Sequence, residues 1–327
     1  MEAKRRLFQT LKAPCVQCSE TAVNVSTGRT PAVELVPDLE RLHHVLQSLT
    51  QPGRPDLQHF DAKLAEYVFY PLSLVFRQRE VVPFRALEAA LQCLRCLLIT
   101  GWRDIDTSQL ATQLLILLTF LADSKLLGKR SDVAPEELRA HALECISELF
   151  LATARVPSTR DAILETQNVP ALGHTITVMI DSCKSGISLA LQLSALRALN
   201  TFVDAVPDRD VLASFFPGIV SALSQVLQVS TKIRRNYQVF VAGLGLLQRI
   251  ISLVLSDDQL AIANIDTVST TATSNTKSAA WLKATEGQLK VALAPILKLR
   301  THDRAEVRLS LRGLCWMVLV DLSLIHI

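Results

Sequence analysis

The sequence is poor in the residues that build turns and sheets. Glycine and proline number 11 and 13 among 327 residues, and aromatic residues make up only 5% of the chain. Sheet folds with many short strands need frequent Gly and Pro in their turns and favour aromatic residues in their strands. Hydrophobic residues nevertheless reach 49%, and Leu, a strong helix former, is the most frequent among them. The composition therefore predicts an all-α protein.

The sequence also lacks a strong excess of charge and a long apolar run. A net charge of +3 is too small to indicate a general nucleic-acid binder. The longest apolar run, Leu110–Ala122, is interrupted by Thr112, Gln113 and Thr119, and it is shorter than the ~20 residues that span a bilayer. No apolar signal-peptide core follows the basic start of the chain. We therefore expect no nucleic-acid and no membrane partner.

Cysteine is present without the pattern of a disulfide framework. The seven Cys residues are odd in number and lie mostly within apolar segments. Such a distribution is typical of a reducing compartment. We therefore expect a cytoplasmic and nuclear location.

Apolar residues at helical spacing recur from one end of the chain to the other. Breaks rich in Pro and Gly separate the segments, as in the run from Gln51 to Pro55. The predicted helices are Glu2–Cys18, Ala32–Thr50, Asp61–Arg79, Pro83–Thr100, Thr107–Ser124, Pro135–Thr153, Pro170–Lys184, Ile187–Val206, Arg209–Val229, Ile233–Leu255, Ala280–Leu299 and Ala305–Leu324.

Five of these segments share a pattern, in which an apolar residue and a polar one lead into a run of small and large apolar residues. The pattern begins at Phe84-Arg85, Leu138-Arg139, Leu191-Gln192, Ile233-Arg234 and Val307-Arg308. The first three recur roughly every 50 residues, near the period of helix-pair repeats. The sequence therefore predicts a HEAT/armadillo-like α-solenoid of stacked antiparallel helix pairs over residues 1–327, with the second helix of each pair on its inner surface.

The polar residue of the pattern and one helix start carry further expectations. We expect the Arg to be a surface residue that reaches neighbouring carboxylates or loop carbonyls. At the last segment, Asp303 is expected to cap the helix and Glu306 to complete a capping box. Residues 264–278 are rich in Ser and Thr and predict a flexible loop within a helix pair. An inert linker is favoured there over a phosphorylation target.

Two Cys-x-x-Cys pairs, Cys15/Cys18 and Cys93/Cys96, raise the hypothesis of a zinc site. On the helix from Phe84 to Leu98, however, Cys93 and Cys96 share a face with small residues, opposite a face of large apolar ones. A helix that packs on two sides has this pattern, so Cys is better interpreted there as a small apolar residue.

No other motif for chemistry occurs. Histidines are isolated or adjacent, as at His43-His44, and phosphate-binding glycine loops are absent. Gly243-x-Gly245 lies inside a predicted helix and suits close packing, whereas Glu136-Glu137 and Asp257-Asp258 suit helix starts. A basic cluster of Lys232, Arg234 and Arg235 beside Tyr237 indicates a solvated helix end rather than a site for an acidic partner. We predict no catalytic residue, metal ligand, cofactor or small-molecule substrate, hence no enzyme, and we assign no individual protein-binding residue.

Several stretches resemble the Tel-two-interacting protein one family. They are Pro14-Cys15-Val16, the Tyr67-x-Phe69-x-Pro71-Leu72 helix, the Phe215-Phe216-Pro217-Gly218 helix, and Trp281-Leu282-Lys283-Ala284-Thr285 followed by Gln288-Leu289-Lys290. The resemblance implies a cochaperone scaffold of the TTT complex. Its implied partners are the other two TTT subunits, the Hsp90/R2TP machinery and phosphatidylinositol-3-kinase-related kinases, whose maturation supports TOR signalling, DNA-damage checkpoints and telomere maintenance.

The family is longer than this chain, so we interpret the sequence as an N-terminal part of one solenoid. On that interpretation we expect an exposed apolar face on the last helix. Two other binding functions are compatible with helix pairs. A karyopherin-like nuclear transport receptor predicts a more acidic inner surface than this slightly basic chain offers. An RNA-binding repeat predicts a basic residue in every repeat, but Gln192 interrupts the series of Arg85, Arg139, Arg234 and Arg308.

Overall fold

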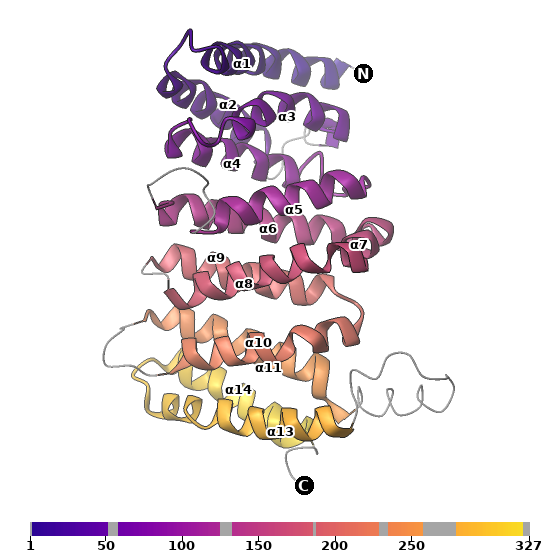
Figure 1. Ribbon diagram of the computed structural model, residues 1–327, viewed down its shortest axis with the longest axis vertical. Helices are drawn as coiled ribbons and strands as arrows, with labels where there is room; N and C mark the ends of the chain where they lie inside the picture. The colour runs from indigo at the N-terminus through magenta and orange to yellow at the C-terminus, as the bar shows by residue number, and fades with distance from the viewer. Residues whose placement is uncertain are drawn as a thin grey trace. The chain divides into compact units, whose positions relative to one another are not determined.

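The computed structural model describes residues 2–51, 58–124, 133–185, 188–228, 235–257 and 279–322. These residues form helices joined by short connections, and no strand occurs in any of the six ranges (Figure 1). The prediction of an all-α stack of helix pairs is confirmed. The expected loop at 264–278 lies outside the described residues.

The chain divides into two compact units, residues 1–178 and 179–327, and each is described by itself. The first unit contains α1 (Glu2–Ser26), η1 (Ala32–Glu34), α2 (Leu35–Leu49), α3 (Ala62–Arg77), α4 (Phe84–Ile99), α5 (Ser108–Ala122), α6 (Glu136–Ala154), α7 (Pro157–Leu164) and η3 (Thr166–Asn168). The division falls within α8 (Val169–Ser185).

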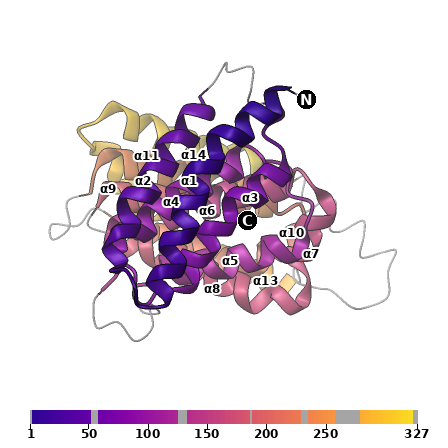
Figure 2. The same ribbon diagram turned by 90° about the horizontal axis from the view of Figure 1, so that it is seen from above.

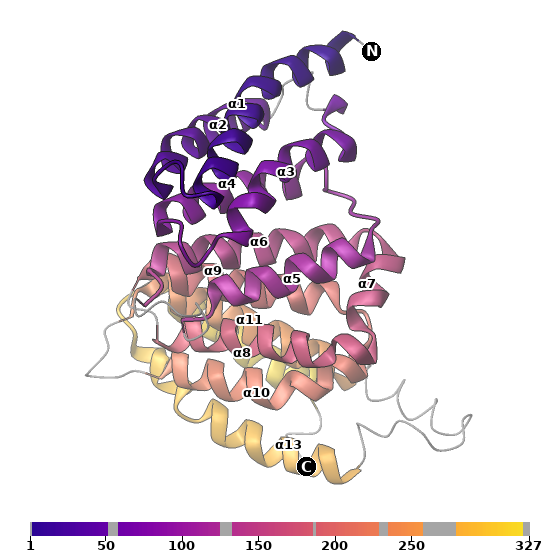
Figure 3. The same cartoon turned by 45° about the horizontal axis from the view of Figure 1, so that its top comes forward.

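The helices of the first unit form two layers. In the first layer α1 packs on α3, and in the second layer α2 packs on α4 and α4 on α6. Each pair joins the layers, since α1 packs on α2, α3 on α4 and α5 on α6. Figures 2 and 3 show α2 and α4 on one side of this unit and α3 and α5 on the other. The second-layer helices therefore meet neighbours on two sides.

The burial pattern of α4 reflects this two-sided packing. Leu87, Leu91 and Leu94 are buried on one face, and Ala86 and Cys93 are buried on the other. The small side chains allow the neighbouring second-layer helices to approach closely. Two thiols form matching contacts between successive repeats: Cys93 Sγ donates to the carbonyl of Leu39 on α2 at 3.7 Å, and Cys145 Sγ donates to that of Leu91 on α4 at 3.3 Å.

Helix α1 is longer than the sequence predicts. The helix continues past Cys18 to Ser26 because Gly28 is the first residue along it that favours a helix end. Gly28 adopts φ 71°, and its N–H donates to Val25 O while Arg29 N–H donates to Asn24 O. These two bonds close the helix with a Schellman motif, for which a left-handed glycine is the usual residue.

Proline occurs inside three of the described helices, Pro14 in α1, Pro71 in α3 and Pro217 in α10. Proline has no N–H to donate to the carbonyl four residues earlier, so each helix loses one internal hydrogen bond. The helices persist because apolar side chains on either side of the proline are buried, such as Leu11 in α1 and Leu72 in α3. Tertiary packing therefore overrides the local cost.

The second unit is built in the same way. It contains α9 (Leu189–Ala205), α10 (Arg209–Leu227), α11 (Tyr237–Leu255), α13 (Ala279–Leu293), η4 (Ile296–Thr301) and α14 (Ala305–Asp321). Helix α11 packs on α9, α10 and α14, and α10 packs on α13. A Cβ on Gly243 would lie 3.0 Å from Leu227 Cδ2, whereas a Cβ on Gly245 would meet open space. Close packing is thus confirmed for Gly243 but not for Gly245.

Three local predictions need correction. The capping box at α14 is wrong: the residue before the helix is Arg304, no side chain caps the helix, and Arg308 instead donates to the carbonyls of His302 and Asp303. The helix predicted over Ala280–Leu299 ends at Leu293, because Pro295 interrupts it and η4 follows. The short helix α7 was not predicted at all.

The arginine at the start of the repeat takes different environments. Arg85 is exposed and pairs with Glu40 at 2.9 Å, as expected of a surface residue. Arg139 is buried instead, at 7% exposure, and its Nε donates to the carbonyl of Ala122 at the end of α5. The repeat's Arg234 lies outside the described residues, but the next residue, Arg235, makes the same kind of contact with the end of α8, through the carbonyls of Cys183 and Lys184. A guanidinium thus satisfies helix-terminal carbonyls that have no partner within their helix.

Two of the described helices, α10 and α11, have the length and hydropathy to cross a membrane. More than half of each apolar window is buried within the unit. Core helices commonly combine these properties, and the buried faces of α10 and α11 account for their composition here.

Arg139 and Arg85 provide a matched test of the contact between the start of a repeat helix and the end of the helix before it. We expect Arg139→Leu to lower the free energy of unfolding by about 1–3 kcal/mol, because a buried hydrogen bond to a helix end is lost. Arg85→Leu, at the corresponding place one repeat earlier, should cost about 0–1 kcal/mol because its ion pair is exposed. Urea unfolding followed by circular dichroism measures both, and equal losses would contradict the assignment.

Candidate functional site

Polar side chains cross the second layer of the first unit as a narrow band, which we call the polar strip. It consists of Glu40 on α2, Arg85, Glu88, Gln92 and Arg95 on α4, and His141, Glu144 and Glu148 on α6. These positions recur at helical spacing on α4, between its two buried faces. The strip therefore lies between the buried faces, and its side chains range from the exposed Arg85 to the buried Glu148.

Ion pairs connect the three helices of the strip. Arg85 on α4 pairs with Glu40 on α2 at 2.9 Å. Arg95 on α4 pairs with Glu144 on α6 at 3.0 Å and lies 3.6 Å from Glu148. Each pair joins one repeat to the next, and both arginines are partly open to solvent, so the pairs set the register between helices more than they add stability.

Histidine and glutamate extend this network. Gln92 Nε2 lies 3.2 Å from His141 Nε2, and His141 Nδ1 lies 3.5 Å from Glu144. Burial raises the pKa of the Glu88 carboxyl. Burial also lowers the pKa of His43, and positive charge on His141 and His44 lowers it further. The contacts of His141 with Gln92 and Glu144 thus continue the polar network from α4 to α6.

The two cysteine pairs of the zinc hypothesis are buried in the core of the first unit. Burial raises the pKa of Cys15 and Cys18 to about 12 and that of Cys93 well above its usual range. A zinc ligand must be a thiolate, and protonated thiols in an apolar core are poor ligands. Among the described residues, no group of three or more His, Cys, Asp or Glu side chains is placed to hold a metal ion. The interpretation of Cys93 and Cys96 as packing residues is confirmed by their burial.

Other residues singled out from the sequence have structural partners. His174 lies 3.2 Å from Asp123, and the His302 ring meets that of Phe240. Of the expected basic cluster, Arg235 binds helix-end carbonyls. The Tyr237 ring instead meets Arg304, which was not part of that cluster and whose guanidinium carbon lies 5.0 Å from the ring centre. Glu136 and Glu137 stand in the first turn of α6, as expected. Lys232, Arg234, Asp258 and His326 lie outside the described residues.

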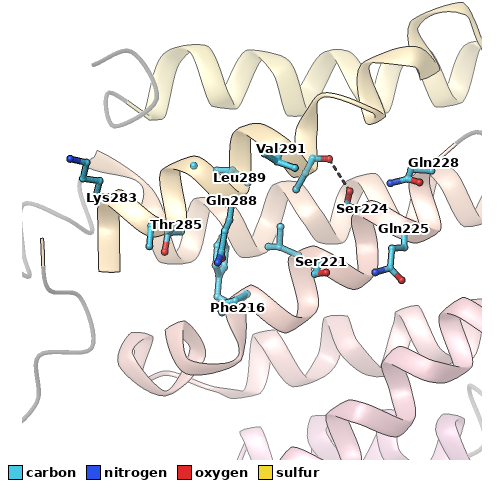
Figure 4. A pocket seen from close by; sticks show the side chains of 15 residues that line it. Phe216, Ser221, Ser224, Gln225, Gln228, Lys283, Thr285, Gln288, Leu289 and Val291 are labelled. Carbon is cyan, nitrogen blue, oxygen red and sulfur yellow. Dashed lines mark hydrogen bonds between the residues drawn. The ribbon is translucent and has the colours of Figure 1, made fainter. Parts of the chain in front are cut away.

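The second unit contains a groove between α10 and α13, with a volume of ≈ 790 Å³. Phe216, Val220 and Leu289 supply apolar surface, and Gln225 and Gln288 stand on opposite sides. In Figure 4 the side chains of α10 face those of α13 across this space. At one point the walls are tied together, since Ser224 Oγ donates to the carbonyl of Ala292 at 2.9 Å.

Sequence reasoning did not identify this groove. The Phe215–Gly218 and Trp281–Lys290 segments, quoted above only as signs of a family, contribute residues to both walls. The Phe216 and Trp281 rings also meet, with their centres 6.4 Å apart. Their separation along the chain concealed this proximity, which depends on α13 packing against α10.

The last described helix presents an apolar face to solvent. Leu309, Trp316, Leu319 and Val320 of α14 are each more than half exposed, while Val307, Leu311, Leu314 and Met317 are buried against the unit. The expectation of an exposed apolar face on the last helix is confirmed.

The buried thiols predict a clear chemical behaviour. Six of the seven cysteines are buried and Cys315 is only partly so. Their raised pKa values keep the thiols protonated at pH 8, so we expect Ellman's reagent to react slowly with the native chain, Cys315 first, and with all seven thiols in guanidinium. Reactivity of the native chain should increase as the pH approaches the raised values. Rapid modification of Cys15 and Cys18 at pH 8 would contradict this assignment, and Cys315→Ser is the control that should remove the fastest phase.

Comparison with known proteins extends over nearly the whole chain. Residues 8–322 match the family described as the TTI1 N-terminal TPR domain. The chain is 24% identical to "TEL2-interacting protein 1" of Saccharomyces cerevisiae over 90% of its length. It is 22% and 21% identical to "TELO2-interacting protein 1 homolog" of Mus musculus and of Homo sapiens, over 93% of its length in each case. No solved structure gives a significant match.

The chain covers only part of these relatives, 31% of the yeast protein and 28% of the mouse and human proteins. Its resemblance to the Tel-two-interacting protein one family, carried by motifs on α1, α3, α10 and α13, agrees with the matched range. The chain belongs to the family of TTI1 N-terminal TPR domains.

Proposed function

We propose that this chain is a non-enzymatic scaffold module that binds a TEL2-type protein within a TTT-type complex. The observation that carries the proposal is the family match over residues 8–322, which includes relatives named for interaction with TEL2. Because the similarity to these relatives extends over nearly the whole chain, the TEL2-type partner in their names is the partner that we propose for it.

The architecture supports a binding role. Stacked helix pairs present side chains from successive repeats on extended surfaces, and repeat proteins commonly use such surfaces to bind partners. The groove between α10 and α13 and the exposed face of α14 are two such surfaces. The polar strip is extended as well, but its charges are paired between repeats.

The same surfaces favour a scaffold over an enzyme. The polar residues of the strip are engaged in ion pairs between helices, and the buried thiols have raised pKa values that disfavour nucleophilic thiolates. Neither arrangement provides an activated nucleophile with an adjacent base. A binding role accounts for these residues without requiring a reaction.

The finer part of the proposal concerns the biological setting. Within a TTT-type complex the chain would support the maturation and stability of phosphatidylinositol-3-kinase-related kinases together with the Hsp90/R2TP machinery. The family resemblance supports this setting, and with it we propose a location in the cytoplasm and the nucleus. The karyopherin-like alternative receives no support from the family match.

Co-purification tests the proposal directly. The full-length protein that carries this chain, affinity-tagged in its own cells, should recover a TEL2-type protein and at least one kinase of the phosphatidylinositol-3-kinase-related class. Recovery should be independent of a Ran-type GTPase, which a transport receptor would require. If neither partner is recovered, or if recovery depends on the GTPase, the scaffold proposal is wrong.

A further inference from the structure

We infer that the second unit binds an extended acidic segment of a partner protein along one edge, which we call the basic edge. This edge is formed by the end of α8, the start of α11, η4 and the first turn of α14. The inference rests on the proposed scaffold function and adds to it a surface and the chemistry of its occupant.

Positive charge is concentrated on the basic edge. Residues 183–184, 235–237 and 294–308 carry six basic side chains and two carboxylates, those of Asp303 and Glu306. The basic residues are Lys184, Arg235, Lys298, Arg300, Arg304 and Arg308, of which the last four are exposed. A surface with this excess of positive charge attracts a partner of opposite charge.

Contacts between the turns make the basic edge one continuous surface. The Arg235 guanidinium at the start of α11 donates to the carbonyls of Cys183 and Lys184 at the end of α8. The Arg304 guanidinium carbon, just before α14, lies 5.0 Å from the centre of the Tyr237 ring in the first turn of α11. Basic side chains of three successive helix pairs therefore stand beside one another, and an extended segment can pass from one to the next.

A hollow at η4 supplies charges that no described residue neutralises. It has a volume of ≈ 790 Å³, and Lys298 and Arg300 belong to its lining. Neither of them forms an ion pair with a described residue. Asp303 is the one carboxylate of the lining, and Leu297, also in the lining, is 46% exposed. A segment with carboxylates on both sides of one apolar side chain complements this hollow.

The opposite ends of these helix pairs carry the opposite charge. Residues 206–210, 255–257 and 321–322 include four carboxylates and one basic residue, Arg209. The carboxylates are those of Asp208, Asp210, Asp257 and Asp321. In Figure 1 the turn from α9 to α10 and the turn from α13 to α14 lie on opposite sides of this unit. An acidic segment is therefore attracted to the basic edge and repelled from the opposite one, which determines where it binds.

The aromatic rings of the basic edge favour a protein segment over a single-stranded nucleic acid. Such a nucleic acid binds by stacking its bases on free aromatic rings. The Tyr237 ring is instead covered by Arg304, and the His302 ring meets that of Phe240 with the ring centres 5.4 Å apart. Recognition of carboxylates needs no free ring, since guanidinium and ammonium groups supply it.

Labelled peptides provide the probe. Short peptides of alternating Glu and Gly around a central Leu, and matched series with Lys or Gln in place of Glu, are titrated with the full-length protein by fluorescence anisotropy. We expect the Glu series to bind best, and its affinity to fall as the NaCl concentration rises. A preference for the Lys or Gln series, or no binding by any series, would overturn the inference. Tighter binding of a uridine oligonucleotide, or of vesicles of phosphatidylcholine and phosphatidylserine, would overturn it as well.

A matched pair of double variants places the binding on the basic edge. Lys298→Glu with Arg300→Glu reverses two charges in the hollow, and Lys12→Glu with Arg5→Glu reverses the same two residue types on α1. The first variant should weaken binding of the Glu series at least about tenfold, whereas the second should leave the affinity close to that of the unchanged protein. All four side chains are exposed, so we expect both variants to melt at the unchanged temperature by circular dichroism. Equal losses of affinity in the two variants would contradict the assignment.

The outcome separates this inference from the proposed function. If the TEL2-type protein is recovered but no acidic peptide binds, the basic-edge assignment fails and the scaffold function stands. If acidic peptides bind with the expected variant pattern but no TEL2-type protein is recovered, the basic edge stands and the proposed partner is wrong.

Discussion

A second-layer helix has to bury two opposite faces, because a helix of the same layer lies on either side of it. On α4 this requirement leaves one face for large residues such as Leu91, one for small residues such as Cys93, and only a narrow band for polar side chains. The thiol of Cys93 is small enough for α2 to approach and polar enough to reach the carbonyl of Leu39. The stacking of the helices, the burial of the cysteine thiols and the narrowness of the polar strip all follow from this requirement.

The same constraint separates surfaces that hold the protein together from those available to a partner. In the polar strip, charges are paired across repeats, so a ligand would first have to displace contacts such as that between Arg95 and Glu144. The groove between α10 and α13 differs, because its carboxamide groups are largely uncommitted. Gln225 and Gln288 are examples, since both are exposed at the walls of the groove. A ligand binds more favourably to polar groups that have no protein partner than to groups whose existing contacts it must first break.

Helix periodicity was sufficient to predict the layers, because two-sided burial leaves a strong pattern in the sequence. Boundaries depended on finer signals: Gly28 ends α1 well after Cys18, and Pro295 interrupts the segment before α14. Arg85 and Arg139 look equivalent in sequence, yet only the second is buried, because its partner is the end of a preceding helix. The groove could not be predicted at all, since Phe216 and Leu289 become neighbours only through the packing of α13 on α10. Local pattern specifies elements, whereas contacts between distant segments specify sites.

Packing between sequence neighbours also has a consequence for how the protein forms. In the first unit α1 contacts α2 and α3, and α4 contacts α2, α3 and α6, so few contacts join distant parts of the chain. Chains with such low contact order fold quickly, since little loop entropy is lost before contacts form. Helices α1 to α4 can therefore pack together while the ribosome is still adding α6. The exposed side of α4 would then serve as a template onto which each new pair condenses, which makes the order of synthesis an order of assembly.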